Sequence, residues 1–193
     1  MDRIVFLDRD GTINVEKNYL FRKEDFQFIP GAIEAIRLLN RNNYKVIVVT
    51  NQAGIARGYY TEEDVIKLHQ YINTVLSKYD AYIDSFFYCP HHPSNGIGDY
   101  KVECHCRKPN TGLFRQSEVL YQVDKGRSWM IGDNISDIQA GLNYQIRTIL
   151  VSTGYGHSVY DELSGKIGVE YYAIDILDAV TYILKSGDIQ FKE

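Results

Sequence analysis

Runs of apolar and β-branched residues alternate with stretches of helical periodicity along most of this chain, and this alternation constrains its fold more than any other feature. Strands are predicted at residues 4–7, 45–50, 85–88, 128–131 and 148–151, with a short one near Tyr171. Helices are predicted over residues 31–43, 113–121, 137–143 and 176–185. This order is typical of a mainly parallel sheet with right-handed crossovers and helices on both faces. We therefore expect a three-layer, Rossmann-like α/β fold.

A further helix is predicted to begin at Thr61. Its hydroxyl can cap the first turn while the Asp64 side chain reaches back, and Val65, Leu68 and Ile72 would form the buried stripe. Only one short loop and one helix fit between Thr12 and Thr50, so no large cap domain is expected there. The active site should therefore be fairly open.

Length and charge limit the class of protein. The 193 residues, 45% of them apolar, can bury one core without disulfides or a partner, so we expect a single domain over residues 1–193 and a monomer. The net charge of −4 and the scattered basic residues argue against nucleic-acid binding. No stretch approaches the roughly 20 apolar residues that a membrane span needs. We expect a cytoplasmic protein without membrane association.

Two carboxylates, Asp8 and Asp10, follow the first predicted strand directly. Side chains alternate along a strand, so both carboxylates could point to one side at its carboxyl end, where open α/β sheets bind ligands, while Arg9 would point away. An ordinary turn is the alternative interpretation, because Asp, Gly and Thr are common where strands end.

Three more polar clusters make the turn interpretation less favourable. They lie at residues 50–52 and 132–137, each after an apolar run, and at residues 107–109, before a predicted helix. Clusters at the carboxyl ends of parallel strands meet at one edge of the sheet. We therefore predict that the four clusters form one site, and the two carboxylates at the end of the first strand indicate phosphoryl-transfer chemistry.

In this order the four clusters resemble the motifs of the haloacid dehalogenase superfamily of phosphohydrolases. The segments 6–14, 50–58 and 88–93 (FLDRDGTIN, TNQAGIARG and YCPHHP) are similar to those of the D-glycero-D-manno-heptose 1,7-bisphosphate 7-phosphatase family. The resemblance covers the chain to about Gly156. It implies the haloacid dehalogenase fold and a phosphatase that forms an aspartyl-phosphate intermediate.

The resemblance also implies roles for individual residues. Asp8 would be the nucleophile, and Asp10 would give a proton to the leaving oxygen and later take one from water. Asp133 would complete a catalytic Mg²⁺ site with Asp8 and the backbone carbonyl of Asp10. Lys108 and Thr50 would stabilise the phosphoryl oxygens. Asp137, four residues after Asp133, could cap a helix, orient the site or simply begin the helix.

All three cysteines lie in one short segment, which favours a metal site over disulfides. The Cys-x-His and Cys-x-Cys pairs offer a complete tetrahedral zinc set within a loop at about residues 89–106: Cys89, His91, Cys104 and Cys106. Four protein ligands leave no open position, so this Zn²⁺ would be structural. His92 and His105 are alternative ligands, and the family pattern favours His91.

The substrate implied by the resemblance is a small phosphosugar. Arg107 is the candidate for a second phosphate, because its planar group suits bidentate binding. Several other residues are expected to contact sugar or phosphate, namely Asn18, Tyr19, Asn51, Gln52, Ala53, Arg57 and Asn134. Some family members carry lysine where this chain has Asn134, so a phosphate contact there should be weaker.

The leading functional prediction is a Mg²⁺-dependent phosphatase that removes the 7-phosphate of the heptose bisphosphate. Its product, heptose 1-phosphate, would serve nucleotide-activated heptose synthesis for lipopolysaccharide or other surface glycans. A histidinol-phosphate phosphatase is the alternative, because those enzymes share the motifs and a similar zinc loop. A noncatalytic, zinc-stabilised binding protein is a further alternative.

Overall fold

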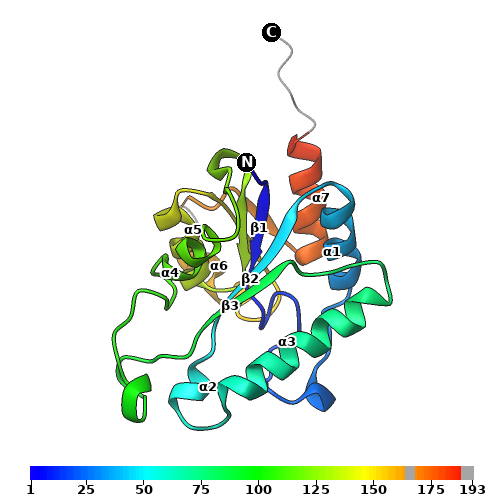
Figure 1. The fold of residues 1–193 in the computed structure, drawn as a ribbon. Helices are drawn as coiled ribbons and strands as arrows, with labels where there is room; N and C mark the ends of the chain where they lie inside the picture. The colour runs from blue at the N-terminus through cyan, green and yellow to red at the C-terminus, as the bar shows by residue number, and fades with distance from the viewer. Residues whose placement is uncertain (164–167, 188–193) are drawn as a thin grey trace.

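The computed structural model describes residues 1–163 and 168–187. Six strands form one parallel sheet in the order β3-β2-β1-β4-β5-β6. The strands are β1 (Ile4–Leu7), β2 (Lys45–Asn51), β3 (Ser85–Cys89), β4 (Trp129–Gly132), β5 (Arg147–Val151) and β6 (Tyr171–Ala173). Figure 1 shows β1 at the centre of the sheet, with helices on both sides. The predicted three-layer α/β architecture is confirmed.

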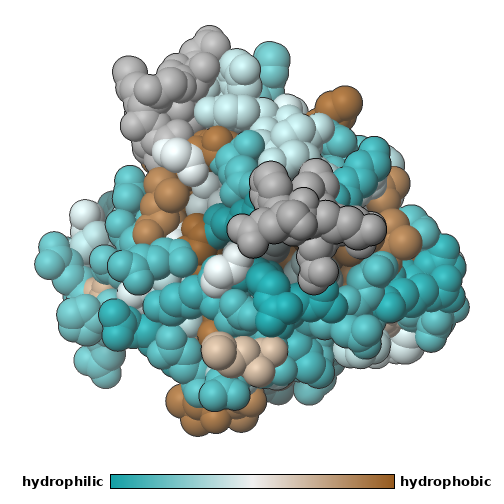
Figure 2. Space-filling model, turned by 90° about the horizontal axis from the view of Figure 1, so that it is seen from above, coloured by the Kyte–Doolittle hydropathy of each residue, from teal (hydrophilic) through white to brown (hydrophobic). Residues whose placement is uncertain are grey.

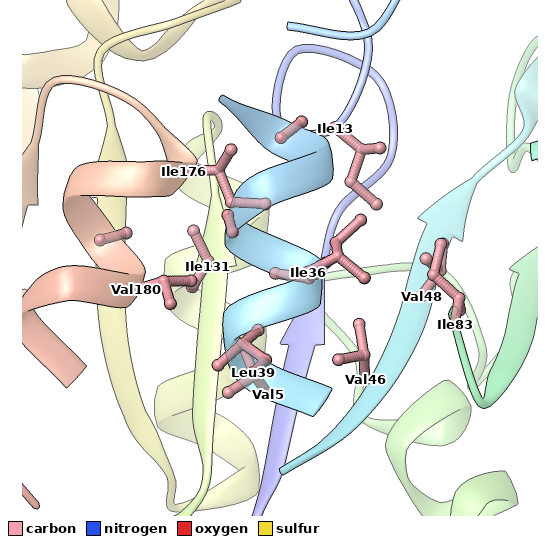
Figure 3. Packing of buried hydrophobic residues seen from close by; sticks show 14 of the residues in the cluster. Val5, Ile13, Ile36, Leu39, Val46, Val48, Ile83, Ile131, Ile176 and Val180 are labelled. Carbon is pink, nitrogen blue, oxygen red and sulfur yellow. The ribbon is translucent and has the colours of Figure 1, made fainter. Parts of the chain in front are cut away.

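The central strand β1 is buried on both faces because both of its side-chain sets are apolar. Val5 and Leu7 join one hydrophobic cluster, and Ile4 and Phe6 join the other. All four side chains are fully buried. Figure 3 shows Val5 next to Leu39 among the buried side chains of the first cluster. A continuous apolar run of this kind is expected of a parallel strand covered by helices on both faces.

Three helices cover one face of the sheet: α1 (Ala32–Arg41), α3 (Glu62–Ser77) and α7 (Ile176–Gly187). The opposite face is covered by α4 (Gly112–Ser117), α5 (Ile135–Tyr144) and α6 (Gly156–Leu163). The predicted start of α3 is confirmed, because Thr61 and Asp64 form a capping box. Leu68 and Ile72 of α3 are buried in the hydrophobic cluster on this face, which holds the helix against the sheet.

Some elements differ from the prediction. The α4 helix ends at Ser117, where the backbone continues in tighter turns to Leu120, instead of at residue 121. The α5 helix begins two residues earlier than predicted, because Asn134 caps it. Two helices were not predicted, α2 (Ala53–Ala56) and α6. The four residues of α2 are too few to show helical periodicity.

The two ends of the sheet differ. Loops gather at the carboxyl ends of the strands, near α2 and the start of α3 in Figure 1. Figure 2 shows the opposite face, where hydrophilic side chains cover most of the visible surface and apolar ones form separate patches. Between β1 and β4, all of which is described, no insertion forms a large cap, as expected. In the described residues no helix is both long and apolar enough to cross a membrane.

Candidate active site

The sheet order brings three of the four predicted clusters together. β1 is hydrogen-bonded between β2 and β4, so Asp8 at the end of β1 lies between Thr50 in β2 and Asp133 just after β4. The backbone N–H of Asp8 continues the sheet by donating to the carbonyl of Ile131 at 3.0 Å. A cavity of about 450 Å³ opens over these strand ends. Its lining includes all five predicted catalytic and magnesium residues, namely Asp8, Asp10, Thr50, Lys108 and Asp133.

Lys108 is the centre of a buried charge cluster. Its Nζ donates to Asp8 Oδ1 at 2.6 Å and to the carbonyl of Val49 at 2.7 Å, and it pairs with Asp137 Oδ1 at 2.7 Å. The residue is only 3% exposed. Burial lowers the pKa of Lys108, but attraction by Asp137 and Asp8 outweighs burial and raises it above the ordinary value. Lys108 is therefore a fixed positive charge beside the predicted nucleophile.

Three carboxylates, Asp8, Asp133 and Asp137, form a second part of this cluster. One oxygen of each lies within 4.8 Å of the others. Two glycines make room for Asp133, because a Cβ on Gly11 or Gly154 would lie within 2.1 Å of its Oδ2. The same Oδ2 accepts the backbone N–H of Tyr155 at 2.8 Å. The chain is thus shaped locally to hold the Asp133 side chain against Asp8.

These carboxylates fit a divalent cation. Burial, together with nearby Asp137 and Asp10, raises the pKa of Asp8 to about 7 even though Lys108 opposes the shift. Burial and the charges of Asp8 and Asp137 raise the pKa of Asp133 to about 9. Carboxylate oxygens are the ligands that Mg²⁺ prefers, and its charge would let Asp8 and Asp133 stay ionised at neutral pH.

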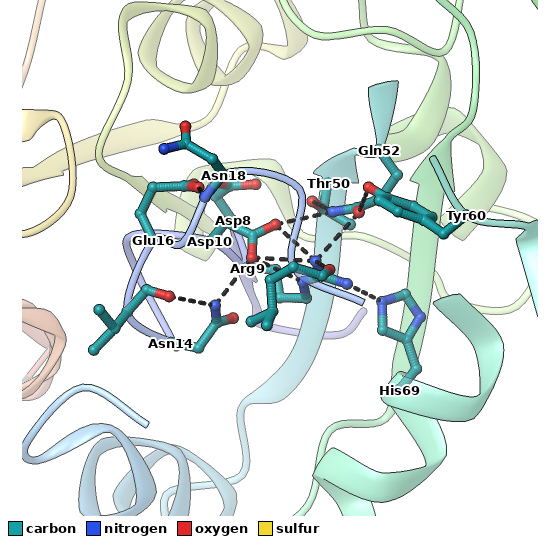
Figure 4. A network of polar contacts seen from close by, with 12 residues as sticks. Asp8, Arg9, Asp10, Asn14, Glu16, Asn18, Thr50, Gln52, Tyr60 and His69 are labelled. Carbon is teal, nitrogen blue, oxygen red and sulfur yellow. Dashed lines mark hydrogen bonds and ion pairs between the residues drawn. The ribbon is translucent and has the colours of Figure 1, made fainter. Parts of the chain in front are cut away.

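Asp10 has a different environment, which Figure 4 shows. Its Oδ1 accepts from Asn14 Nδ2 at 2.9 Å, and its Oδ2 accepts from Arg9 Nη2 at 2.8 Å and from Gln52 Nε2 at 3.0 Å. The expectation that Arg9 points away from both carboxylates is wrong. These residues lie beyond the end of β1, and the long side chain of Arg9 places its guanidinium against the Asp10 carboxylate.

Gln52 does not line the cavity, although it was predicted to bind substrate. It is 2% exposed, and its Nε2 bonds Asp10 and Thr50 while its Oε1 accepts from Tyr60 and Arg9. All of its hydrogen-bonding groups are therefore used inside the protein. The Thr50 hydroxyl accepts from Gln52, which leaves its own proton free for a phosphoryl oxygen.

Asn51 and Lys108 hold the second and third clusters together. Asn51 Nδ2 donates to the Lys108 carbonyl at 3.1 Å, and the Lys108 N–H donates to Asn51 Oδ1 at 3.0 Å.

Asn134 caps α5 by accepting the N–H of Ser136, and its own N–H donates to Asp137 Oδ2 at 3.0 Å. Of the roles left open for Asp137, the structure shows capping of the helix, and it adds an ion pair with Lys108 that was not predicted.

The Cys/His cluster consists of Cys89, His91, Cys104 and Cys106, whose ligand atoms lie within 4.8 Å of one another. Cys106 Sγ lies 3.0 Å from Cys89 Sγ, 3.2 Å from Cys104 Sγ and 3.4 Å from His91 Nδ1. None of the three cysteines forms a disulfide. Hydrogen bonding from Cys89 and Cys104 lowers the pKa of Cys106 to about 5, which favours a thiolate. This donor set fits a tetrahedral zinc site.

The loop that carries the Cys/His cluster forms one wall of the cavity. Tyr88 and Tyr100 donate to the two oxygens of Glu62 at 2.7 and 2.8 Å, which ties the loop to the start of α3. The N–H of Ile97 donates to the carbonyl of Ala56, which ties it to α2. His105 is exposed on this loop, whereas His92 lines the cavity.

The structure places nearly all predicted substrate-contacting residues at the cavity. These are Asn18, Tyr19, Asn51, Ala53, Arg57, Arg107 and Asn134. Arg107 Nη1 donates to the carbonyl of His91, so the Cys/His loop aims its guanidinium. Asn18 and Tyr19 both have a positive φ, of 48° and 63°, a backbone conformation that non-glycine residues adopt at some cost in strain.

Five residues that line the cavity were not predicted to contact the substrate or the catalytic metal: Glu16, Tyr60, His92, Ser136 and Tyr155. Burial and the charge of Asp10 raise the pKa of Glu16. His92 Nδ1 accepts two backbone N–H groups, from Ser94 and Asn95, so the neutral ring carries its proton on Nε2. Glu16 and Tyr155 stand in loops without a distinctive local pattern, so the sequence carried no signal for them.

Family comparisons agree with this geometry. Residues 5–82 match a model described as haloacid dehalogenase-like hydrolase, and residues 105–179 match a HAD-hydrolase-like model. The chain is 38% identical over 186 residues to a D-glycero-beta-D-manno-heptose-1,7-bisphosphate 7-phosphatase of Haemophilus influenzae. The aligned residues cover 96% of this chain and 98% of that protein. It is 45% identical over 151 residues to the protein of that name from Vibrio cholerae, covering 78% and 81%.

A solved structure supports the same relationship. The D,D-heptose 1,7-bisphosphate phosphatase of B. bronchiseptica, complexed with magnesium and phosphate, has a TM-score of 0.84 and 28% identity and covers 96% of this chain and 99% of that one. The phosphatase of the same name from Burkholderia thailandensis has a TM-score of 0.70 and 27% identity, covering 95% and 99%. This chain is a phosphatase of the haloacid dehalogenase superfamily and belongs to the heptose 1,7-bisphosphate 7-phosphatase family.

Proposed function

We propose that this phosphatase removes the 7-phosphate of D-glycero-D-manno-heptose 1,7-bisphosphate and releases heptose 1-phosphate. One observation carries the proposal. Arg57 and Arg107 line the same cavity as the reactive cluster, and neither pairs with a carboxylate among the ion pairs of the described residues. Two guanidinium groups without a carboxylate partner suit a second phosphate dianion, which a bisphosphate has and histidinol phosphate lacks.

The first step transfers the phosphoryl group to the enzyme. An oxygen of Asp8 attacks the phosphorus, and the bond between phosphorus and the C7 oxygen breaks. Asp10 gives its proton to that oxygen, which leaves as the alcohol. Lys108 Nζ, already 2.6 Å from Asp8 Oδ1, supplies positive charge beside the transferring group, and Thr50 can donate its hydroxyl proton.

The second step releases phosphate. Water attacks the phosphorus of the aspartyl phosphate, its proton passes to Asp10, and the bond between phosphorus and the Asp8 oxygen breaks. Asp10 is thereby protonated again and ready for the next cycle. The network around Asp10 keeps its carboxylate in one place for both proton transfers.

Asp8, Asp133 and the backbone carbonyl of Asp10 would hold Mg²⁺, and Asp137 adds a carboxylate oxygen nearby. Bound Mg²⁺ offsets the negative charge of the phosphoryl group. Cys89, His91, Cys104 and Cys106 would hold a structural Zn²⁺ that orders the cavity wall and with it Arg107.

The proposal extends to the setting of the reaction. Heptose 1-phosphate is the substrate type for nucleotide activation, so the enzyme would serve surface-glycan synthesis. Three cysteines without disulfides fit the reducing cytoplasm, and we propose a cytoplasmic monomer of one domain that binds neither nucleic acid nor membranes.

The test is phosphate release from α- and β-heptose 1,7-bisphosphate and from histidinol phosphate, with Mg²⁺ present and Asp8→Asn as the blank. The expected result is a clear preference for one heptose anomer. Preference for histidinol phosphate would overturn the substrate and the role of Arg107 but keep the catalytic assignments. No turnover of any of the three would favour the noncatalytic alternative.

A further inference from the structure

Arg9 is a buried cation that the chemistry above does not use. It is 0% exposed, and Nη2 donates to Asp10 Oδ2 at 2.8 Å, to the carbonyl of Leu20 at 3.0 Å and to Gln52 Oε1 at 3.2 Å. Nε and Nη2 also reach Asp10 Oδ1 at 3.3 and 3.1 Å. A buried guanidinium is costly unless it is paired and its donors are satisfied. Here the pairing partner is the residue proposed to carry the proton.

The far side of Arg9 is held by His69 of α3. His69 is 5% exposed, its ring stacks on Phe86 with centroids 4.3 Å apart, and its Nε2 lies 3.4 Å from Arg9 Nη1. Burial and the charge of Arg9 lower the pKa of His69 to about 2, so the ring is neutral. The neutral Nε2 accepts a hydrogen bond from Arg9 Nη1, which places the ring's own proton on Nδ1. His69 thus fixes the orientation of Arg9.

Gln52 and Tyr60 complete the network from the other side. Tyr60 donates to Gln52 Oε1 at 2.7 Å, which fixes the amide so that Nε2 faces Asp10 at 3.0 Å and Thr50 at 2.8 Å. Figure 4 shows the chain of contacts that runs from His69 through Arg9 to Asp10 and from Tyr60 through Gln52 to Asp10. Two buried arms therefore converge on one carboxylate.

We propose that Arg9 is the positioning residue for Asp10, with Gln52 as the second arm and with His69 and Tyr60 as their supports. The proposal rests on the function proposed above, in which Asp10 transfers the proton. It assigns to the arginine between the two aspartates a direct role in the reaction geometry. Of the two aspartates, the arms reach only Asp10, because Asp8 is held by Lys108 and by the backbone; Gln52 also donates to the Thr50 hydroxyl. Disturbing Arg9 should therefore impair proton transfer more than attack by Asp8.

This selectivity gives the test. A sugar alkoxide needs a proton from Asp10 to leave, whereas p-nitrophenolate leaves p-nitrophenyl phosphate without one. Rapid mixing of the enzyme with each substrate therefore separates proton donation by Asp10 from attack by Asp8. In Arg9→Lys, which keeps the charge but loses the planar fork, we expect the first turnover of heptose bisphosphate to slow by roughly 10²-fold. The first release of p-nitrophenol should change by less than about 3-fold, followed by slow turnover, because the second step also needs Asp10.

Tyr60→Phe is the milder variant. It keeps the ring and removes only the hydroxyl that orients Gln52, so it should fold even where Arg9→Lys does not. We expect the same bias against the sugar substrate, with a loss of roughly 2- to 10-fold. The matched control is Arg147→Lys, since Arg147 pairs with Glu170 at the amino end of β5 and should leave both rates unchanged.

Equal slowing with both substrates would show that Arg9 only supports the fold of the strand end. No slowing with either substrate would show that Arg9 has no role in the reaction. Either result overturns the proposal. Asp10→Asn, measured in parallel, separates this proposal from the proposed function. If Asp10→Asn leaves the first turnover of the sugar substrate unchanged, the proposed function is wrong. If Asp10→Asn shows the bias and both Arg9→Lys and Tyr60→Phe lack it, only the positioning role fails.

Discussion

The carboxylate cluster and the Cys/His cluster are both suited to a metal, but the chain holds them in place in different ways. Asp8 and Asp133 follow β1 and β4 at the centre of the sheet, and Asp137 lies in the first turn of α5. The Cys/His cluster begins at the end of the edge strand β3 and continues through residues 90–106, all described, where the only regular element is the 3-10 turn Gly98–Tyr100.

This difference predicts which cluster needs its metal in order to stay folded. Backbone hydrogen bonds of the sheet hold the carboxylates together against their mutual repulsion, so removing Mg²⁺ should stop the reaction without unfolding the protein. The Cys/His loop has little apolar core of its own, and a bound Zn²⁺ contributes directly to the stability of such a segment. The first cluster should govern turnover, and the second should govern the order of the cavity wall.

The largest effect is expected from Asp8→Asn. It removes the nucleophile while keeping the size of the side chain, so turnover should fall by at least on the order of 10³-fold. The melting temperature should not fall, because the amide introduces no buried charge. Phosphate release and thermal denaturation measure the two properties, and Asp80→Asn, at an exposed ion pair, is the control. Unfolding of Asp8→Asn would contradict the separation of the two clusters.

The next effect compares two histidines of the same loop. His91→Gln removes a ligand atom of the Cys/His cluster, whereas His105→Gln changes an exposed neighbour. We expect His91→Gln to lose the bound zinc, measured by elemental analysis, and to lose about 3 kcal/mol of stability, or roughly 6–12 °C in melting temperature. His105→Gln should match the parent protein. Equal zinc content and melting in both variants would rule out His91 as a ligand.

A smaller effect is expected where the loop is tied to α3. Glu62→Gln weakens the acceptors of the Tyr88 and Tyr100 hydroxyls, which should lower the free energy of unfolding by roughly 1.5 kcal/mol. Glu63→Gln, next to it, breaks only the exposed pair with Lys67 and should leave the free energy of unfolding unchanged. Urea denaturation measures both variants. If they were equally stable, the Glu62 contacts would not anchor the loop.

The smallest effect concerns pH and His69. Its pKa is about 2 in the folded protein and about 6.5 when unfolded, so the unfolded chain binds the proton more readily. The resulting stability is present above pH 6.5 and is lost as the pH falls towards 2. When the pH falls from 7 to 5.5, the free energy of unfolding of the wild type should decrease by about 1.2 kcal/mol more than that of His69→Gln. Denaturation curves at both pH values test this, and parallel losses in the two proteins would show that His69 is not held neutral.

Much of the fold could be predicted because it depends on local pattern. The apolar run at residues 4–7 became β1, and the capping signals at Thr61 and Asp64 marked the start of α3. The short α2 helix was missed because four residues carry no period, and α4 ended early because its last turn is tighter than an α-helix. Local signals do not specify how the last turn of a helix closes.

For the candidate site, single residues could be predicted from the sequence, but several contacts between their side chains could not. Strand ends identify Asp8 and Asp133, and ligand spacing identifies Cys104 and Cys106, because these signals are local. The contact of Arg9 with Asp10 and the ion pair between Lys108 and Asp137 were not predicted. Both depend on how far a long side chain reaches through space, which the order of residues along the chain does not show.

The decisive measurement is to locate the covalent intermediate. The Mg²⁺-loaded enzyme is mixed with heptose 1,7-bisphosphate, quenched within one turnover and treated with borohydride, which reduces an aspartyl phosphate to homoserine. Peptide mapping by mass spectrometry then shows which aspartate reacted. Homoserine at position 8, and its absence in Asp8→Asn, is the predicted result. Reduction at another aspartate, or none under conditions that release phosphate, would contradict the assignment of the carboxylate cluster as the reaction centre.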